Sequence, residues 1–279
     1  MNLSVSVPPL ATPISVAEAK AWLKVTDSQH DTKLDGLVRA ATGLVETITR
    51  RALVQRTMVL RRNGFPAGAL VLPSPPLRSV SSIAYTDSAG DAQTWAAANY
   101  QADVYAEPGT VCPVYGVSYP ATKPSTYNTV TVTYKAGYAV KFTAATSDTI
   151  TATGHAFADT DRVRLYTSGP EGCALPGGLS EDTDYYVRDM SGETFKLAAS
   201  SGGSAIDITS TGTGTGVQHY VCPAAVGVVP REIRTAMLML ISHWFENPQA
   251  VNVGNLVTEY PINVDWLLQD HRVLRFDLG

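Results

Sequence analysis

The sequence predicts an α+β fold in which helices near both ends of the chain bracket antiparallel β structure. Apolar residues recur at three- and four-residue steps in residues 31–49 and 230–246, as in amphipathic helices. Residues 52–135 instead alternate with the two-residue period of strands, and residues 141–222 are rich in Thr, Ser and Gly. We therefore expect a helical core, made by N- and C-terminal helices packed together, with antiparallel β hairpins and an inserted small all-β domain.

A short helix is expected first, over residues 16–24. Ser15 and Glu18 have the spacing of a capping box, in which the hydroxyl and the carboxylate bond free backbone amides at a helix start. The side chains expected on its buried side are Ala19, Trp22 and Leu23.

A longer helix follows over residues 31–49, capped by Asp31. Its apolar stripe consists of Leu34, Leu37, Val38, Ala41, Leu44, Val45 and Ile48. Gly36 and Gly43 within it each cost about 1 kcal/mol relative to alanine. We interpret both glycines as sites of close helix packing.

The next segment reads as an antiparallel β unit with Pro-rich loops. The expected strands cover residues 54–62, 69–72, 80–85, 93–95 and 129–134. Turns are expected at residues 63–66 and 87–91, where Asn, Asp and Gly gather.

Residues 141–222 differ from their surroundings in charge as well as in composition. They hold five Lys/Arg against ten Asp/Glu, whereas the rest of the chain holds sixteen against fifteen. Strand candidates are residues 149–153, 162–166, 185–188, 194–197 and 205–208. The sequence therefore predicts two domains: residues 1–140 with 223–279 as the core, and residues 141–222 as an inserted β-sandwich or barrel-like module. Its two ends should lie close together, as insertion requires.

Helix is expected again near the C-terminus. Pro230 suits the first helical position, and a short candidate follows at residues 264–268. The apolar stripe of the helix over residues 230–246 consists of Ile233, Met237, Leu240, Ile241, Trp244 and Phe245. Antiparallel packing of residues 31–49 against 230–246 would bury both stripes.

Catalytic and cofactor-binding motifs are missing from the sequence. No two of the five histidines share a helix at metal-ligand spacing, and three widely spaced cysteines make neither a zinc motif nor a disulfide framework. Residues 212–216 alternate Gly and Thr but precede no helix, so they predict a linker or hairpin tip rather than a phosphate loop. There is no secretory signal and no apolar run of membrane-span length. We expect no enzyme activity, cofactor or metal.

Five arginines gather between the long helix and the first strand: Arg50, Arg51, Arg56, Arg61 and Arg62. They could contact an acidic partner surface or line a DNA channel. Alternatively, they are cations at a helix C-terminus followed by a solvated strand face, which is the interpretation we favour. The net charge of −4 argues against a general nucleic-acid binder.

The acidic β segment allows a second hypothesis. Its tyrosines, Tyr166, Tyr185 and Tyr186, could form a platform for a carbohydrate. A stabilising surface domain is the favoured alternative.

Several short motifs occur in an order that resembles the head–tail connector (adaptor) proteins of long-tailed double-stranded DNA phages. They lie at residues 13–23, 51–57, 72–80, 83–85, 134–138, 230–233, 243–247 and 271–276. The resemblance covers residues 10–140 and 228–277. In that family the strand ending in Ala136, Gly137 and Tyr138 leads quickly to the Pro-started helix. Here residues 141–222 intervene, and they look like β modules inserted into other phage structural proteins.

The resemblance implies a structural virion protein of the neck, assembled in the host cytoplasm. It would form a ring, with twelve subunits expected, beneath the portal protein, and would join capsid to tail through a downstream neck or tail-completion protein. DNA would pass non-specifically through its channel. Arg272, Arg275 and Phe276, which end the chain with few intrachain partners, would contact portal or a neighbouring subunit. A glycan- or receptor-binding virion protein acting through the inserted domain is the alternative.

Overall fold

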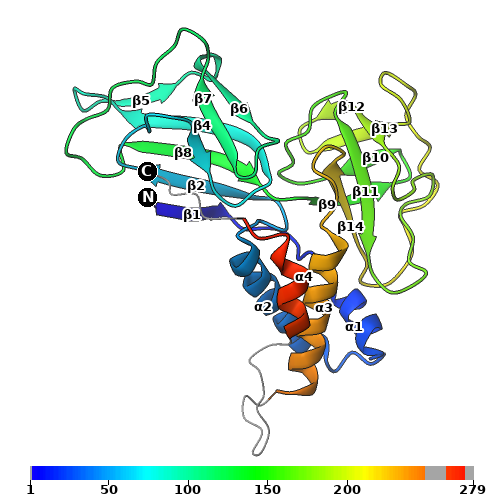
Figure 1. Ribbon diagram of the computed structural model, residues 1–279. Coiled ribbons are helices and arrows are strands. Elements are labelled where there is room, and N and C mark those ends of the chain that lie inside the picture. Colours follow the sequence, from blue (N-terminus) through cyan, green and yellow to red (C-terminus); the bar gives the residue numbers. More distant parts are fainter. Residues whose placement is uncertain (1, 249–261, 274–279) are drawn as a thin grey trace, which may run out of the picture. The chain divides into compact units, whose positions relative to one another are not determined.

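A computed structural model describes residues 2–248 and 262–273 and divides the chain into two compact units (Figure 1). Unit 1 comprises Met1–Pro9, Arg50–Gly137 and Val273–Gly279, and unit 2 comprises Leu10–Thr49 and Tyr138–Arg272. The described residues form four α-helices and fourteen strands, and every strand pairing is antiparallel. The expected α+β class is confirmed.

Unit 1 consists of two antiparallel sheets with an apolar core. The five-stranded sheet has the order β1 (Asn2–Val7), β2 (Arg56–Arg62), β8 (Val130–Ala136), β4 (Leu77–Thr86), β5 (Ala92–Trp95). The three-stranded sheet has the order β3 (Leu70–Leu72), β7 (Gly109–Pro113), β6 (Tyr100–Asp103), and a short 3₁₀ helix, η1, covers Ala97–Asn99. On β8, Val130, Val132 and Tyr134 are fully buried in this core, while the threonines between them are partly exposed. The alternation seen in the sequence thus separates the two faces of the sheet.

Gly137 ends unit 1 at a position that requires glycine. Its φ is +127°, and a Cβ there would lie 2.5 Å from the backbone nitrogen of Gln55. Its own N–H donates to the carbonyl of Pro76 at 2.9 Å. The close backbone approach explains the Ala-Gly-Tyr segment, because any side chain would push the chain off the segment that leads into β2.

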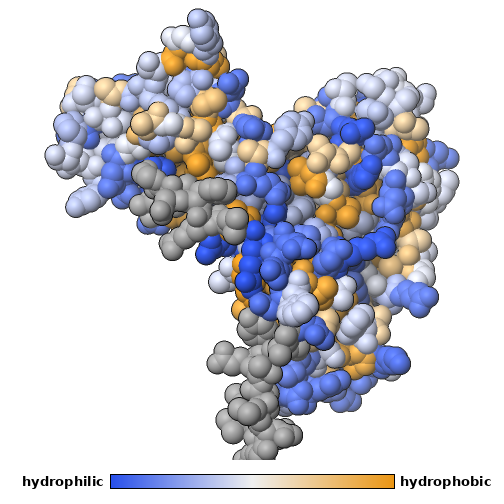
Figure 2. Space-filling model, viewed as in Figure 1, coloured by the Kyte–Doolittle hydropathy of each residue, from blue (hydrophilic) through white to orange (hydrophobic). Residues whose placement is uncertain are grey.

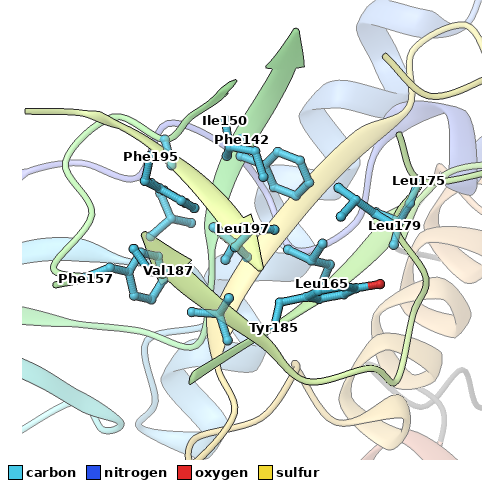
Figure 3. Packing of buried hydrophobic residues seen from close by; sticks show 14 of the residues in the cluster. Phe142, Ile150, Phe157, Leu165, Leu175, Leu179, Tyr185, Val187, Phe195 and Leu197 are labelled. Atoms are coloured by element: carbon cyan, nitrogen blue, oxygen red, sulfur yellow. The ribbon is translucent and has the colours of Figure 1, made fainter. Parts of the chain in front are cut away.

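Unit 2 contains a closed six-stranded barrel. The order is β10 (Thr149–Thr151), β13 (Thr194–Ala198), β12 (Tyr185–Ser191), β11 (Arg162–Ser168), β14 (Gln218–Pro223), β9 (Val140–Ala145). Apolar side chains from these strands and from the loop containing Leu175 and Leu179 converge in its interior (Figure 3). Val140 and Val221 are register partners, so the first and last strands of the barrel lie side by side.

The expected strands of this segment are largely present, with two differences. Residues 205–208 are not a strand, since only an isolated bridge joins Ala205 to Ala198. The strands β9 and β14, which close the barrel, were not expected. Their pairing joins residues about 80 positions apart and leaves no periodic mark in either segment.

Four helices complete unit 2: α1 (Val16–Leu23), α2 (Asp31–Thr49), α3 (Arg231–Glu246) and α4 (Ile262–Gln269). Helix α3 packs against each of the others, and α2 also contacts α1 and α4. Leu34, Val38 and Ile241 are fully buried. All four helices occur within two residues of their expected bounds.

Three details of the helices correct the expectations. Trp22 is 48% exposed, because the buried side of α1 is set by Ala19 and by the polar contacts of its first turn. A Cβ added at Gly36 or Gly43 would meet no atom within 4 Å, so the close-packing interpretation is wrong; both glycines lie on the exposed side of α2. Asp31 is the first residue of the helix rather than its cap.

The two compact units have other boundaries than the two domains that the sequence predicts. They group the four helices with the barrel, and the hairpins of residues 50–137 form a unit without them. Whether residues 141–222 fold by themselves stays a prediction. Within the described ranges, no helix has the length and apolar character of a membrane span.

Candidate interaction sites

The five arginines do not form one cluster. Arg51 is only 9% exposed and makes a bidentate ion pair with Glu107, with Nη1–Oε1 at 2.7 Å and Nη2–Oε2 at 2.5 Å. This pair ties the start of the 50–137 segment of unit 1 to the loop between β6 and β7. Arg51 is thus committed to an intramolecular contact of the kind that fixes geometry on both partners.

The other four arginines are spread along and before β2. Arg50 is exposed, has a φ of +57°, and its Nη1 donates to the carbonyl of Val273 at 3.4 Å. Arg56 begins β2 and Arg62 ends it, which separates their Cα atoms by about 20 Å. Arg61 Nη1 donates to Ser4 Oγ at 3.2 Å. The segment therefore presents cations at both ends of one strand.

The strand registers bring polar residues together on the face of the five-stranded sheet opposite the apolar core. We call this set the hydroxyl face; it consists of Ser4, Thr57, Arg61, Ser79, Ser82, Thr131, Thr133 and Lys135, which are partly exposed and surround the buried Val59. Lys135 stands opposite Thr57 and Ser79, and Arg61 stands opposite Thr131. None of the strand residues that these registers assign to the face is acidic. The face could attract an anionic partner.

The C-terminal residues are only partly placed. The guanidinium of Arg272 pairs with the carboxylate of Asp265 on α4, so it has an intrachain partner that the sequence did not suggest. His271 Nε2 lies 3.6 Å from Glu232 Oε2 on α3. Arg275 and Phe276 lie outside the described residues.

A polar network inside unit 2 joins α1, α3 and the barrel. Ser15 N–H donates to Ser168 Oγ at 2.7 Å, and Ser15 Oγ donates to the Ser168 carbonyl at 2.9 Å. Arg234 Nη2 donates to both carboxylate oxygens of Glu18, at 2.9 and 2.8 Å. The Ser168 hydroxyl also donates to Glu18. Glu18 therefore holds α3 and β11 together from its place on α1.

The expected capping box is half formed. Glu18 N–H donates to Ser15 Oγ at 3.1 Å, as the motif requires. The Glu18 carboxylate, however, turns to Arg234 instead of to the Ser15 amide, and Ser168 takes over that amide. The sequence motif marked the helix start but not the ion pair.

Two stacked tyrosines continue the network into the barrel wall. The rings of Tyr166 and Tyr220 lie 4.8 Å apart, and the guanidinium of Arg234 lies 5.5 Å from the Tyr166 ring centre. Burial raises the pKa of both tyrosines, so they stay neutral. Burial lowers the pKa of Arg234, but the Glu18 carboxylate more than offsets this and the net pKa is raised. Nothing in the sequence pattern pointed to this network, whose members are up to 216 positions apart.

The described barrel tyrosines do not form a sugar platform. Tyr166 and Tyr185 are 3% and 4% exposed, and Tyr185 belongs to the barrel core (Figure 3). Tyr186 alone of the three is partly exposed. Two of the three rings that could stack on a carbohydrate are therefore buried.

Two of the histidines pack against aromatic rings. His155 stacks on Phe157 with ring centres 5.4 Å apart, and His30 meets Phe245 edge-on at 5.3 Å. In residues 2–248 and 262–273, no three His, Cys, Asp or Glu side chains are grouped so that they could hold a metal ion.

Comparison with known proteins gives likeness in fold. No family model matches the sequence, and no curated protein matches it. A chain of the virion of a native gene transfer agent (GTA) particle is similar with a TM-score of 0.53 and 16% identity. Chains in the neck of an empty GTA particle computed with C6 symmetry and in the neck of a native GTA particle computed with C12 symmetry have TM-scores of 0.52 and 0.50, at 16% and 18% identity. Each comparison covers 100% of this chain and 99% of the other, so the likeness in fold includes the barrel segment.

Proposed function

We propose that this chain is a structural subunit of a virion neck, forming a ring that docks beneath a portal protein, extends the DNA channel and receives a downstream neck or tail-completion protein. The observation that carries the proposal is the fold likeness to chains of GTA virions and necks over the full length of both chains. The order of connector-like motifs in the sequence supports the same role independently.

A ring is the assembly that fits this role. The similar necks were computed with C6 and C12 symmetry, and we propose twelve copies here. A closed ring requires two different, complementary patches on each subunit rather than reactive groups. The ring contacts of His30 and His155 agree with a structural role for these two side chains.

The arginines take different parts in this proposal. Arg51 orders the loop that contains Glu107, whereas Arg50, Arg56, Arg61 and Arg62 offer positive charge to a partner or to passing DNA. DNA contact would be non-specific, because these arginines would bind phosphates rather than base edges.

Electron microscopy of the purified chain with the portal protein of its own particle tests the proposal. We expect an added ring of density coaxial with the portal, with twelvefold symmetry. Failure of the chain to bind the portal ring at any ionic strength would refute the neck role.

The C-terminal tail is the proposed portal or neighbour contact, with Phe276 as apolar anchor and Arg275 as charged contact. Because Arg272 already pairs with Asp265, its part is to orient the start of the tail. A chain truncated after Gln269 should keep its helical circular dichroism and lose most of its portal binding. Unchanged portal binding would refute this assignment.

A further inference from the structure

The turn after β2 contains an asparagine followed by a glycine, Asn63 and Gly64. Both residues lie in a bend between β2 and β3, and Asn63 is exposed. Figure 2 shows white and blue atoms over much of unit 1 in this view, so polar surface of this unit is open to water. The fold uses these two residues as a turn, but the side-chain amide of an asparagine can also react with the main-chain nitrogen of the glycine that follows it.

The Gly64 main-chain nitrogen is free to act as a nucleophile. Among residues 2–248 and 262–273, neither the Gly64 N–H nor the Asn63 Nδ2 group has a hydrogen-bond partner. A Cβ added at Gly64 would meet only Thr122 Oγ1 within 4 Å, at 3.6 Å, so no neighbouring backbone crowds this nitrogen. Glycine has no Cβ of its own to hinder an attack, and its backbone is the least restricted of all residues. The nitrogen can therefore approach Asn63 Cγ without breaking a hydrogen bond.

The Asn63 side-chain carbonyl is polarised by a main-chain donor from a distant part of unit 1. Its Oδ1 accepts a hydrogen bond from the Asn128 N–H at 3.0 Å, across 65 positions of the chain. A donor fixed at this distance stabilises negative charge that develops on the oxygen, as the donors of an oxyanion hole do. Asn63 Cγ is therefore more electrophilic in the folded chain than in the unfolded chain, where this donor is absent.

We propose that Asn63 is a site of spontaneous deamidation through a cyclic succinimide formed with Gly64. The Gly64 nitrogen gives its proton to hydroxide or water and forms a bond to Asn63 Cγ, which moves an electron pair onto Oδ1. The Asn128 N–H stabilises that oxygen until the Cγ–Nδ2 bond breaks and ammonia leaves with a proton from water. Water then adds to one of the two ring carbonyl carbons and breaks its bond to the Gly64 nitrogen. The balance is one water consumed and one ammonia released, with nothing oxidised or reduced.

The ring opens to two products with different consequences for unit 1. Addition of water at Cγ leaves aspartate, which keeps an acceptor for the Asn128 N–H. Addition at the main-chain carbonyl carbon leaves isoaspartate, which lengthens the backbone between β2 and β3 and so disturbs the hydrogen bond to Asn128. Either product places a negative charge directly after Arg62. That loss of positive charge matters for the proposed function, in which Arg61 and Arg62 face a partner or DNA, whereas the reaction itself does not depend on it.

Ageing of the purified chain at mildly alkaline pH, followed by tryptic peptide mapping, tests the proposal. The tryptic peptide of residues 63–78 contains no other Asn or Gln, so the mass change from amide to acid reports on Asn63 alone. Asn63 should convert about tenfold or more faster than Asn128, which is also exposed but precedes the β-branched Thr129. An isoaspartyl methyltransferase should label the aged chain, because isoaspartate forms through the cyclic intermediate and not by direct hydrolysis of the side-chain amide.

Two variants separate the reaction from general ageing of the chain. Gly64→Ala should fold, because the added Cβ meets only Thr122 Oγ1 at 3.6 Å, and it should slow the conversion by about tenfold or more. Asn63→Gln should not convert on the same time scale, since its longer side chain would have to close a larger ring. Circular dichroism checks that both variants fold.

The comparison with the unfolded chain tests what the fold contributes. The native chain should convert at least as fast as the chain in guanidinium chloride, because only the native chain has the Asn128 donor on Oδ1. Equal rates at Asn63 and Asn128, or a native chain that stays intact while the unfolded chain converts, would overturn the inference. Failure of the neck role would appear instead as a lack of portal binding by the fresh chain, so the two failures are distinguishable.

Discussion

At Glu18, one carboxylate accepts hydrogen bonds from Arg234 and from the Ser168 hydroxyl. Its side chain is 13% exposed and that of Arg234 is 22% exposed. Two charges at this depth are costly to desolvate, and only the several hydrogen bonds make the pair tolerable. Removing one partner should therefore cost more than removing both.

Arg234→Met should lower the free energy of unfolding by about 3 kcal/mol, because it leaves the Glu18 carboxylate in a nearly buried site without its cation. Urea unfolding followed by circular dichroism measures this. Arg39→Met is the matched control: Arg39 pairs with Asp35 on the surface of α2 at 69% exposure, and its loss should cost less than about 0.5 kcal/mol. The double variant Glu18→Gln/Arg234→Met should lose less than Arg234→Met alone, because no unpaired charge is left. Equal costs for Arg234 and Arg39 would contradict this account.

His219 should make unit 2 sensitive to acid. Burial lowers the pKa of His219, with a smaller contribution in the same direction from Lys141. As the pH falls through the ordinary histidine range of about 6.5, the unfolded chain takes up this proton before the folded chain does. Stability from this group is therefore complete above that pH and is lost on acidification.

His219→Gln should flatten the fall in unfolding free energy between about pH 7.5 and pH 5.5, since it removes the group that titrates differently in the two states. Urea unfolding of both proteins at the two pH values gives the comparison. An unchanged slope in the variant would show that His219 is not responsible.

At the scale of the element, α2 contains two glycines that the fold does not need. Gly36→Ala and Gly43→Ala should each raise the free energy of unfolding, by up to about 1 kcal/mol, because both positions are exposed and open. Thermal unfolding should show a higher Tm for each and a further increase for the pair.

Gly137→Ala is the contrasting control. Here the added Cβ meets the backbone of Val54 and Gln55 at 2.5–2.6 Å, and φ is +127°. This change should lower the Tm strongly, whereas a loss of stability at Gly36 or Gly43 would indicate a packing partner on that side of α2.

At the scale of the whole molecule, the barrel is both joined to the chain like an insertion and packed like part of the helical unit. Its first and last strands are neighbours, with Val140 opposite Val221. Yet Ser168 and Tyr166 on β11 contact α1 and α3. The barrel can therefore have the adjacent ends of an inserted domain and still stabilise the helices that it contacts.

Replacement of residues 141–222 by a short Gly/Ser linker should preserve the helical circular dichroism but lower the Tm, because Ser15 and Glu18 lose Ser168 and Arg234 loses the Tyr166 ring. Ring formation and portal binding through the tail should both persist. A chain without a cooperative helical melt would mean that the segment is part of the core.

What the sequence by itself determined is the local content of the fold. The three- and four-residue steps of α2 and α3, the alternation of β2 and β8 and the Ser15 cap all depend on neighbours a few positions apart. The acidity of residues 141–222 follows from composition alone. Such features are visible in a single sequence, because backbone hydrogen bonding imposes one period on helices and another on strands.

Only the tertiary structure decided which elements share a unit and which charges meet. Glu18 pairs with Arg234, 216 positions away, and Arg51 pairs with Glu107, 56 positions away. Strand β9 pairs with β14 and so closes the barrel. The tertiary structure also leaves Trp22 exposed and buries Tyr166. These outcomes depend on which surfaces are buried together, and burial is a property of the packed chain that no local period records.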